Sequence, residues 1–180
     1  EKDIPYRILG GQSFFEKREV KDVLAYLSLF LNPSDDVSLL RLINQPPRGI
    51  GNMTISTATE FSIQKNCSIF EVLRNKEYLG TLSARALSAV RAFRDQVESY
   101  ADAVGSQSLN YAAMTSGLLD EIGFMDYVRR QCRTSEEAMA REQTVNDLLE
   151  SMKLHRERSS ASGVLRDFMD SVALRQEKED

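Results

Sequence analysis

The sequence predicts an all-α, multi-helix domain, and three observations support this fold class. Apolar residues recur at i, i+3, i+4 and i+7 through most of the chain, which is the spacing of amphipathic helices. Helix-capping patterns, two of them Ser/Thr-x-x-Glu boxes, precede several of these stretches. Only residues 4–9 have the composition of a β-strand, and one strand cannot be stable alone. We therefore expect this short N-terminal strand to pair with another part of a larger protein.

The first helices are predicted from apolar periodicity and from proline. A helix is expected over 18–31, because its apolar residues fall on one face: Val20, Val23, Leu24, Leu27 and Leu31. Asn32 is the expected N-cap of a second helix, with Pro33 at its first position. This helix should run to Asn44 and stop before Pro46 and Pro47, which cannot continue it. A third helix is expected over 54–65.

The rest of the chain contains six further predicted helices. Ser68 and Glu71 form a capping box for a short helix, and Ser83 opens a long one that Gly105 ends. Ser108 is the expected cap of the next helix, which Gly123 breaks. The later helices are expected over 124–132, from the Thr134-x-x-Glu137 capping box onward, and over 164–174. Nine helical segments are therefore expected in total.

Composition bounds the functional class. The chain has 180 residues, 42% of them apolar and 28% charged, which suits a soluble globular domain. The net charge is −4, so any contact with nucleic acid must be local and cannot arise from a broad basic surface. Cys67, Cys132 and a single histidine make neither a disulfide framework nor a metal site, which favours a cytoplasmic location. No apolar stretch is long enough for a membrane span, and no signal peptide opens the chain.

The most informative stretch for function is Pro46-Pro47-Arg48-Gly49-Ile50-Gly51, between two apolar helical runs. Its two glycines permit a tight turn and leave N–H groups free at the start of the next helix, where the helix dipole favours an anion. Ile50 would fold back and pin the two helices together. This helix-hairpin-helix-like turn has two interpretations: it binds a DNA phosphate, or it is only a structural connection.

Other candidate groups indicate no catalysis. No Gly-x-x-x-x-Gly-Lys-Ser/Thr loop is present to hold a nucleotide, so the chain itself is expected to bind no ATP and to have no ATPase activity. His155 lies among basic residues and is predicted to be a solvated helix residue. Asp35 and Asp36 are expected to stabilise a helix N-terminus, in preference to binding a metal. The basic clusters at 129–133 and 153–158 are expected to be solvated faces, with phosphate contact as the alternative.

Five blocks of sequence, taken together, resemble one known family. They are residues 4–15 (IPYRILGGQSFF), 19–27 (EVKDVLAYL), 32–36 (NPSDD), 40–44 (LRLIN) and 46–54 (PPRGIGNMT). In order, spacing and identity they are similar to the UvrD/Rep/PcrA type of superfamily 1 DNA helicase. From about residue 60 onward the resemblance is one of helical pattern and length only.

The resemblance implies a domain organisation. Residues 1–15 would be the edge of the parent 2A motor domain, 16–175 the helical 2B subdomain, and 176–180 the linker that returns to the motor. Entry and exit of an inserted subdomain must be close together. We therefore expect the chain near Phe15 and Glu16 to lie beside the chain near Arg175.

The resemblance also implies a function and its site. The parent enzyme would be an ATP-dependent 3′-to-5′ DNA helicase of repair or replication, using ATP and Mg bound outside this chain. The 2B subdomain would contact the backbone of double-stranded DNA at a single-strand/duplex junction and regulate unwinding. The DNA-binding residues implied are Arg48, Gly49, Ile50, Gly51 and Thr54. The alternative is a helical protein-interaction module of a helicase whose hairpin is only structural.

Overall fold

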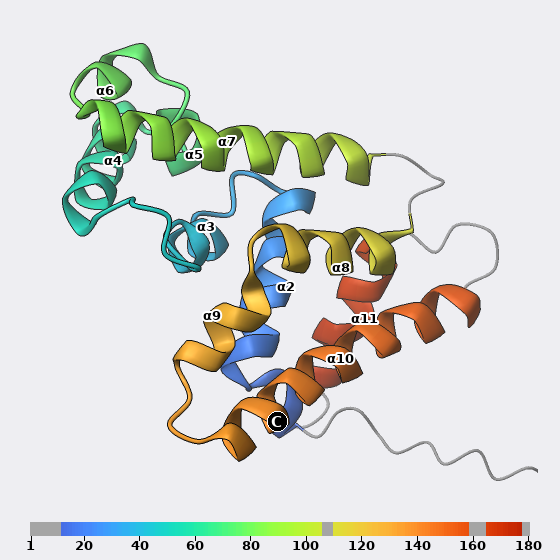
Figure 1. Cartoon of the computed structure of the whole chain (residues 1–180). Helices are drawn as coiled ribbons and strands as arrows, with labels where there is room; N and C mark the ends of the chain where they lie inside the picture. Colours follow the sequence, from blue (N-terminus) through green and yellow to red (C-terminus); the bar gives the residue numbers. More distant parts are fainter. Residues whose placement is uncertain (1–11, 106–109, 159–164, 178–180) are drawn as a thin grey trace, which may run out of the picture. The chain divides into compact units, whose positions relative to one another are not determined.

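The computed structural model describes residues 12–105, 110–158 and 165–177. Every regular element in these ranges is a helix, which confirms the all-α class (Figure 1). The strand expected at residues 4–9 and the cap expected at Ser108 lie outside the described residues. None of the described helices combines the length and the apolarity needed to cross a membrane.

The described residues form eleven helices, two more than the nine expected. The unexpected ones are short: α1 (Gln12–Phe15) and α6 (Lys76–Gly80), the second capped by the side chain of Asn75. The others are α2 (Arg18–Leu31), α3 (Asp36–Leu42), α4 (Asn52–Lys65), α5 (Ile69–Val72), α7 (Ala84–Val104), α8 (Tyr111–Glu121), α9 (Phe124–Arg130), α10 (Ser135–Arg158) and α11 (Leu165–Glu177).

The chain divides into two compact units, and the division falls within α2. One unit contains residues 25–106, including α3 to α7. The other joins residues 1–24 to residues 107–180, including α1 and α8 to α11. Each unit has its own buried apolar core, and each is described separately below.

In the unit of residues 25–106, α5 packs against both α3 and α4. The Ser68–Glu71 capping box forms as predicted and starts α5. A carboxylate oxygen of Asp36 accepts a hydrogen bond from the Ile69 N–H at 2.8 Å, which ties α3 to α5. Ser83 caps α7, and this helix buries Val90, Phe93 and Val97 as its apolar stripe predicts.

The start of the second predicted helix is wrong by several residues. The side chain of Asn32 accepts from the Ser34 N–H in a local turn and caps no helix. The N-cap of α3 is Asp35, whose carboxylate accepts from the Ser38 N–H at 3.1 Å. Asn and Asp side chains bond neighbouring backbone in both turns and caps, so two such residues three positions apart leave the helix boundary ambiguous.

In the second unit, α10 packs against α8, α9 and α11 (Figure 1). Gly123 adopts a φ of 63° between α8 and α9, as expected for the residue that breaks a helix. The N-cap of α8 is Asn110, whose side chain accepts from the Ala113 N–H. The hydroxyl of Thr134 caps α10, but the carboxylate of Glu137 accepts from the Arg133 N–H, so the reciprocal half of the predicted box is shifted by one residue.

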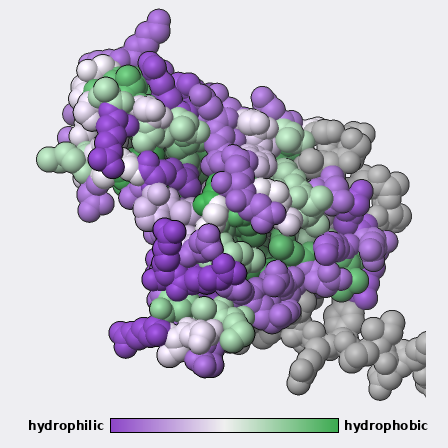
Figure 2. All heavy atoms as spheres, viewed as in Figure 1, coloured by the Kyte–Doolittle hydropathy of each residue, from purple (hydrophilic) through white to green (hydrophobic). Residues whose placement is uncertain are grey.

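The first and last helices of the described chain are in contact within this unit. Helix α1, at residues 12–15, packs against α11, at residues 165–177. This contact agrees with an insertion whose entry and exit are close together, and the expected proximity of Phe15 and Arg175 themselves stays a prediction. The face drawn in Figure 2 is mainly hydrophilic, with hydrophobic residues in small separate areas. Exposed apolar side chains include Val37, Met53 and Ile63.

Candidate nucleic-acid interface

The connection between α3 and α4 is a tight turn built by glycine and proline. Helix α3 ends at Leu42, and the Gln45–Pro46 peptide bond that follows is cis. Gly49 has a φ of 87°, which side-chain-bearing residues rarely adopt. The conformation of Gly49 thus turns the chain toward α4, and glycine is required at this position.

Ile50 anchors the turn. Its side chain is fully buried, as the sequence predicts, while Gly49 and Gly51 on either side are exposed. An apolar side chain between two exposed glycines fixes the turn to the core and leaves the backbone on both sides accessible. Ile50 therefore anchors the turn in the core, while the backbone of Gly49 and Gly51 faces solvent.

Gly51 is the N-cap of α4 and leaves the first turn of that helix without a side-chain cap. The first N–H groups of an α-helix have no partner within the helix, and they carry the positive end of its dipole. No atom lies within 4 Å of the place where a Cβ on Gly51 would stand. The N–H groups of this end of α4 are thus accessible to an anion from solvent.

The conformation of Gly51 corrects one part of the sequence argument. Its φ is −80°, an ordinary extended value that any residue adopts. Of the two glycines, only Gly49 is required by the turn. The absence of a side chain at Gly51 matters for close approach to the backbone and not for local geometry.

The Arg48 guanidinium is turned into the protein. Its Nη2 donates to the hydroxyl of Tyr26 at 2.6 Å and to the carbonyl of Gln45 at 3.3 Å. Its Cζ lies 4.9 Å from the centre of the Phe93 ring, a cation–π contact. Arg48 therefore joins α2 and α7 to the turn, and its contact with a phosphate stays a prediction.

Tyr26, Gln45 and Arg48 are joined pairwise by hydrogen bonds on the inner side of the turn. The Tyr26 hydroxyl donates to the Gln45 carbonyl at 2.7 Å, so one oxygen links α2 to both the turn and Arg48. The Asn44 side chain accepts from the Arg48 N–H at 2.9 Å. Nη1 of Arg48 is buried and has no hydrogen-bond partner among the described residues. These contacts hold the backbone of residues 44–48 in one arrangement.

Two further groups border the turn. Thr54, in the first turn of α4, is half-buried, and its carbonyl accepts from the Tyr78 hydroxyl at 3.1 Å. Arg85, in the first turn of α7, is exposed, and its Nε lies 3.9 Å from the position of a Cβ on Gly49. Sequence reasoning did not select Arg85, because only the tertiary fold brings it beside a glycine 36 positions earlier.

The expectation for His155 is wrong. The ring is half-buried, its Nδ1 lies 2.9 Å from the Tyr111 hydroxyl, and its centre lies 5.5 Å from that of Phe168. Burial lowers the pKa of His155, an effect that the charge of Asp167 opposes. Burial also raises the pKa of Tyr111 to about 12. His155 is therefore a packed residue that joins α8, α10 and α11.

The other candidate groups have structural partners. Asp35 caps α3 and Asp36 bonds α5, so neither carboxylate is free for a metal. Within the described residues no group of three or more His, Cys, Asp and Glu is placed to hold a metal ion. In the first basic cluster, Arg129 is ion-paired with Glu142 and with Asp126.

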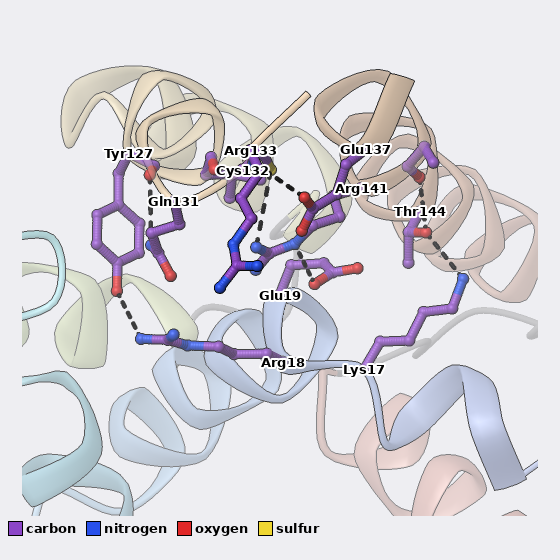
Figure 3. A network of polar contacts seen from close by, with 12 residues as sticks. Lys17, Arg18, Glu19, Tyr127, Gln131, Cys132, Arg133, Glu137, Arg141 and Thr144 are labelled. Carbon is purple, nitrogen blue, oxygen red and sulfur yellow. Dashed lines mark hydrogen bonds and ion pairs between the residues drawn. The ribbon is translucent and has the colours of Figure 1, made fainter. Parts of the chain in front are cut away.

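A second polar cluster connects the start of α2 to α9 and α10 (Figure 3). The Glu19 carboxylate, 4% exposed, accepts from Nε of Arg141 at 2.9 Å. Lys17 Nζ donates to the Thr144 hydroxyl at 3.0 Å. These charged groups have partners within the protein, so the cluster holds helices together and is not a candidate for binding DNA.

Comparison with known proteins assigns this helical chain to a class of DNA helicase domains. All of its residues, 1–180, match the family model described as the UvrD-like helicase C-terminal domain. The chain belongs to this family, which confirms the assignment made from the five sequence blocks.

Several curated relatives are similar over most of the chain. The ATP-dependent DNA helicase PcrA of Bacillus subtilis is 30% identical over 169 residues, which cover 94% of this chain and 22% of the relative. The PcrA helicase of Staphylococcus epidermidis is 30% identical over 131 residues, 73% of this chain and 18% of the relative. A probable DNA helicase II homolog of Rickettsia conorii is 26% identical over 150 residues, 83% of this chain and 22% of the relative. The chain thus spans about one fifth of the length of these relatives.

Proposed function

We propose that this chain is the duplex-DNA-binding and regulatory 2B subdomain of an ATP-dependent 3′-to-5′ DNA helicase that acts in repair or replication. Residues 16–175 form the subdomain in this proposal, residues 1–15 belong to the edge of the 2A motor domain, and residues 176–180 lead back to it. The contact of α1 with α11 supports this arrangement, because an insertion must begin and end in one place. ATP and Mg would bind in the rest of the helicase.

The DNA contact proposed is the turn between α3 and α4. The backbone of Gly49, Gly51 and Thr54 would meet phosphate oxygens of a duplex at a single-strand junction, while Ile50 anchors the turn. The observation that carries this proposal is the uncapped N-terminus of a 14-residue helix that follows an exposed glycine with open space around it. Contacts with phosphate alone carry no sequence information, so binding is expected to be independent of sequence.

Few phosphates can be reached from one such turn. We expect about two or three, so log K should fall with log salt at a slope of about −2 to −3. The dissociation constant should be on the order of 10⁻⁴ M or weaker at physiological salt. Fluorescence anisotropy of a labelled duplex, titrated at several salt concentrations between low and physiological, measures both quantities.

Gly51→Val tests the site directly. The new side chain enters open space and an ordinary φ, so the fold should be retained while the added carbons block the approach of a phosphate. Gly117→Val is the matched control, because Gly117 is also exposed and has open space around its Cβ position. Duplex affinity that is unchanged in Gly51→Val, with circular dichroism like that of the wild type, would refute the proposal.

The alternative is a protein-interaction module in which the hairpin has only a structural role. The exposed side chains of Val37 and Ile63, 82% and 75% accessible, favour this possibility, since apolar groups at a surface suit a protein partner. Duplex binding that is absent at low salt would make this alternative the better explanation.

A further inference from the structure

The contacts of Arg48 raise the question of which cation faces a phosphate at this turn. Nη2 of Arg48 has two acceptors, and its Cζ lies 4.9 Å from the centre of the Phe93 ring. To reach DNA, Arg48 would have to leave these partners and break the network that links Tyr26 to Gln45. Its present position is one in which it supports the turn from within.

Arg85 has the opposite properties. It is exposed, and among the described residues no hydrogen-bond or ion-pair partner is assigned to it. Its Nε lies 3.9 Å from the position that a Cβ on Gly49 would take, so this side chain lies beside the backbone of the turn. Gly49 is two residues from the N-cap of α4, so its Cα is within about 7.6 Å of that of Gly51.

The start of α7, which carries Arg85, is fixed by a helix cap. The Ser83 side chain caps α7 by accepting from the Ala86 N–H at 3.3 Å, which fixes the turn of helix that carries Arg85. Eight residues further along the same helix, about 12 Å away, Phe93 contacts Arg48. Helix α7 therefore contacts the turn at two places: Phe93 contacts the Arg48 side chain, and Arg85 lies beside the exposed backbone of Gly49.

We propose that Arg85 is the residue that supplies positive charge to a DNA phosphate at this turn, and that Arg48 is a positioning residue. The inference rests on the proposed function, and it adds a binding residue from a distant helix. Arg85 and the N–H groups at the start of α4 would share one phosphate or two adjacent ones. Arg48 would act on DNA only through the conformation that it gives to residues 44–49.

Salt dependence separates the two arginines. Removing a cation that contacts phosphate lowers the magnitude of the slope by about 0.9, so the affinity lost in Arg85→Ala should be about eightfold greater at 0.01 M salt than at 0.1 M. Arg85→Lys should restore the slope, because lysine binds phosphate as a point charge. Arg91→Ala is the matched control for total charge, since Arg91 is an exposed arginine on the same helix.

A positioning residue gives a different pattern. Arg48→Ala and Arg48→Lys should weaken duplex binding equally and leave the slope of log K against log salt unchanged. Arg48 positions the turn through the planar donors of its guanidinium and their contact with the Phe93 ring, and lysine cannot reproduce these contacts. Tyr26→Phe should act in the same direction, although Tyr26 is fully buried and cannot meet DNA. Circular dichroism and urea unfolding show whether each variant is still folded. The Arg85 side chain is exposed, so its variants should fold normally and test the phosphate contact even if the Arg48 variants do not fold.

The outcomes are distinguishable. If Gly51→Val weakens duplex binding but Arg85→Ala behaves like Arg91→Ala, this inference is wrong and the proposed function stands. A slope that falls in Arg48→Ala and recovers in Arg48→Lys would likewise return the phosphate contact to Arg48. If neither Gly51→Val nor Arg85→Ala changes the affinity, the inference and the proposed function both fail.

Discussion

The two glycines of the turn should respond differently to alanine, although they are only two positions apart. Gly49 has a φ of 87°, whereas Gly51 has a φ of −80° and a ψ of 166°. Neither position is crowded: the nearest atom to a Cβ on Gly49 is Nε of Arg85 at 3.9 Å, and Gly51 has none within 4 Å. Any difference between Gly49→Ala and Gly51→Ala therefore reports backbone conformation and not steric collision.

The magnitudes follow from these angles. A side chain in the left-handed region costs about 1–2 kcal/mol. Replacing glycine by alanine also restricts the unfolded chain, which stabilises the folded state by about 0.4–1 kcal/mol. For Gly49→Ala the first effect exceeds the second, and the free energy of unfolding should fall by about 1 kcal/mol. For Gly51→Ala the second effect is opposed by the loss of glycine at an N-cap, a position at which alanine is disfavoured by a similar amount, so the free energy of unfolding should change by less than about 0.5 kcal/mol.

Urea denaturation monitored by far-ultraviolet circular dichroism measures both changes, provided that the m-value stays constant. The sign of the difference matters more than its size. If Gly51→Ala destabilises as much as Gly49→Ala, the extended conformation assigned to Gly51 is wrong. Gly51→Val could then disturb the fold as well, and its effect on duplex binding would no longer report the phosphate contact alone.

Two further predictions concern the unit that contains α8 to α11. Glu19→Gln should lower the free energy of unfolding, measured in urea, by about 3 kcal/mol, because the guanidinium of Arg141, whose side chain is 18% exposed, loses its charged partner. The double variant Glu19→Leu/Arg141→Met, which removes both charges, should recover most of this stability. Since burial lowers the pKa of His155 in the folded protein, the unfolded chain binds a proton first, and stability should decrease as pH falls below about 6.5. Between pH 7.5 and 5.5 the urea midpoint of His155→Phe should depend less on pH than that of the wild type. An equal pH dependence in both proteins would show that protonation of His155 does not destabilise the fold.

Much of the fold could be predicted from local sequence, because helices with strong caps and a clear apolar stripe are determined locally. Helix α2 begins and ends where its periodicity predicts, and Ser68, Ser83 and Gly123 act as expected. The errors fall where two capping residues compete, as at Asn32 and Asp35, or where a helix is too short to show a period, as in α1 and α6. In such places tertiary contacts decide between alternatives of similar local energy.

His155 shows a second limit. Its neighbours in sequence are basic, so a solvated position was the reasonable expectation, yet the ring packs beside Tyr111 and Phe168. Tyr111 lies 44 positions away in sequence. The partners that bury a helical residue come from other helices, and a local charge pattern does not reveal them.

The candidate site combines both cases. The glycines and the isoleucine of the turn are visible in the sequence because their roles are set by local backbone geometry and by burial. Arg48 is adjacent to them in the sequence, which favours it for a phosphate contact. The sequence does not determine whether its side chain points to solvent or into the protein. Arg48 has an aromatic ring, a hydroxyl and a carbonyl within reach on the inner side, and each contact stabilises the guanidinium there. Arg85 has none of these among the described residues and stays exposed beside Gly49. A cation that is not engaged within the protein gives up no internal contact when it meets an anion, which is the physical reason for assigning the phosphate to Arg85.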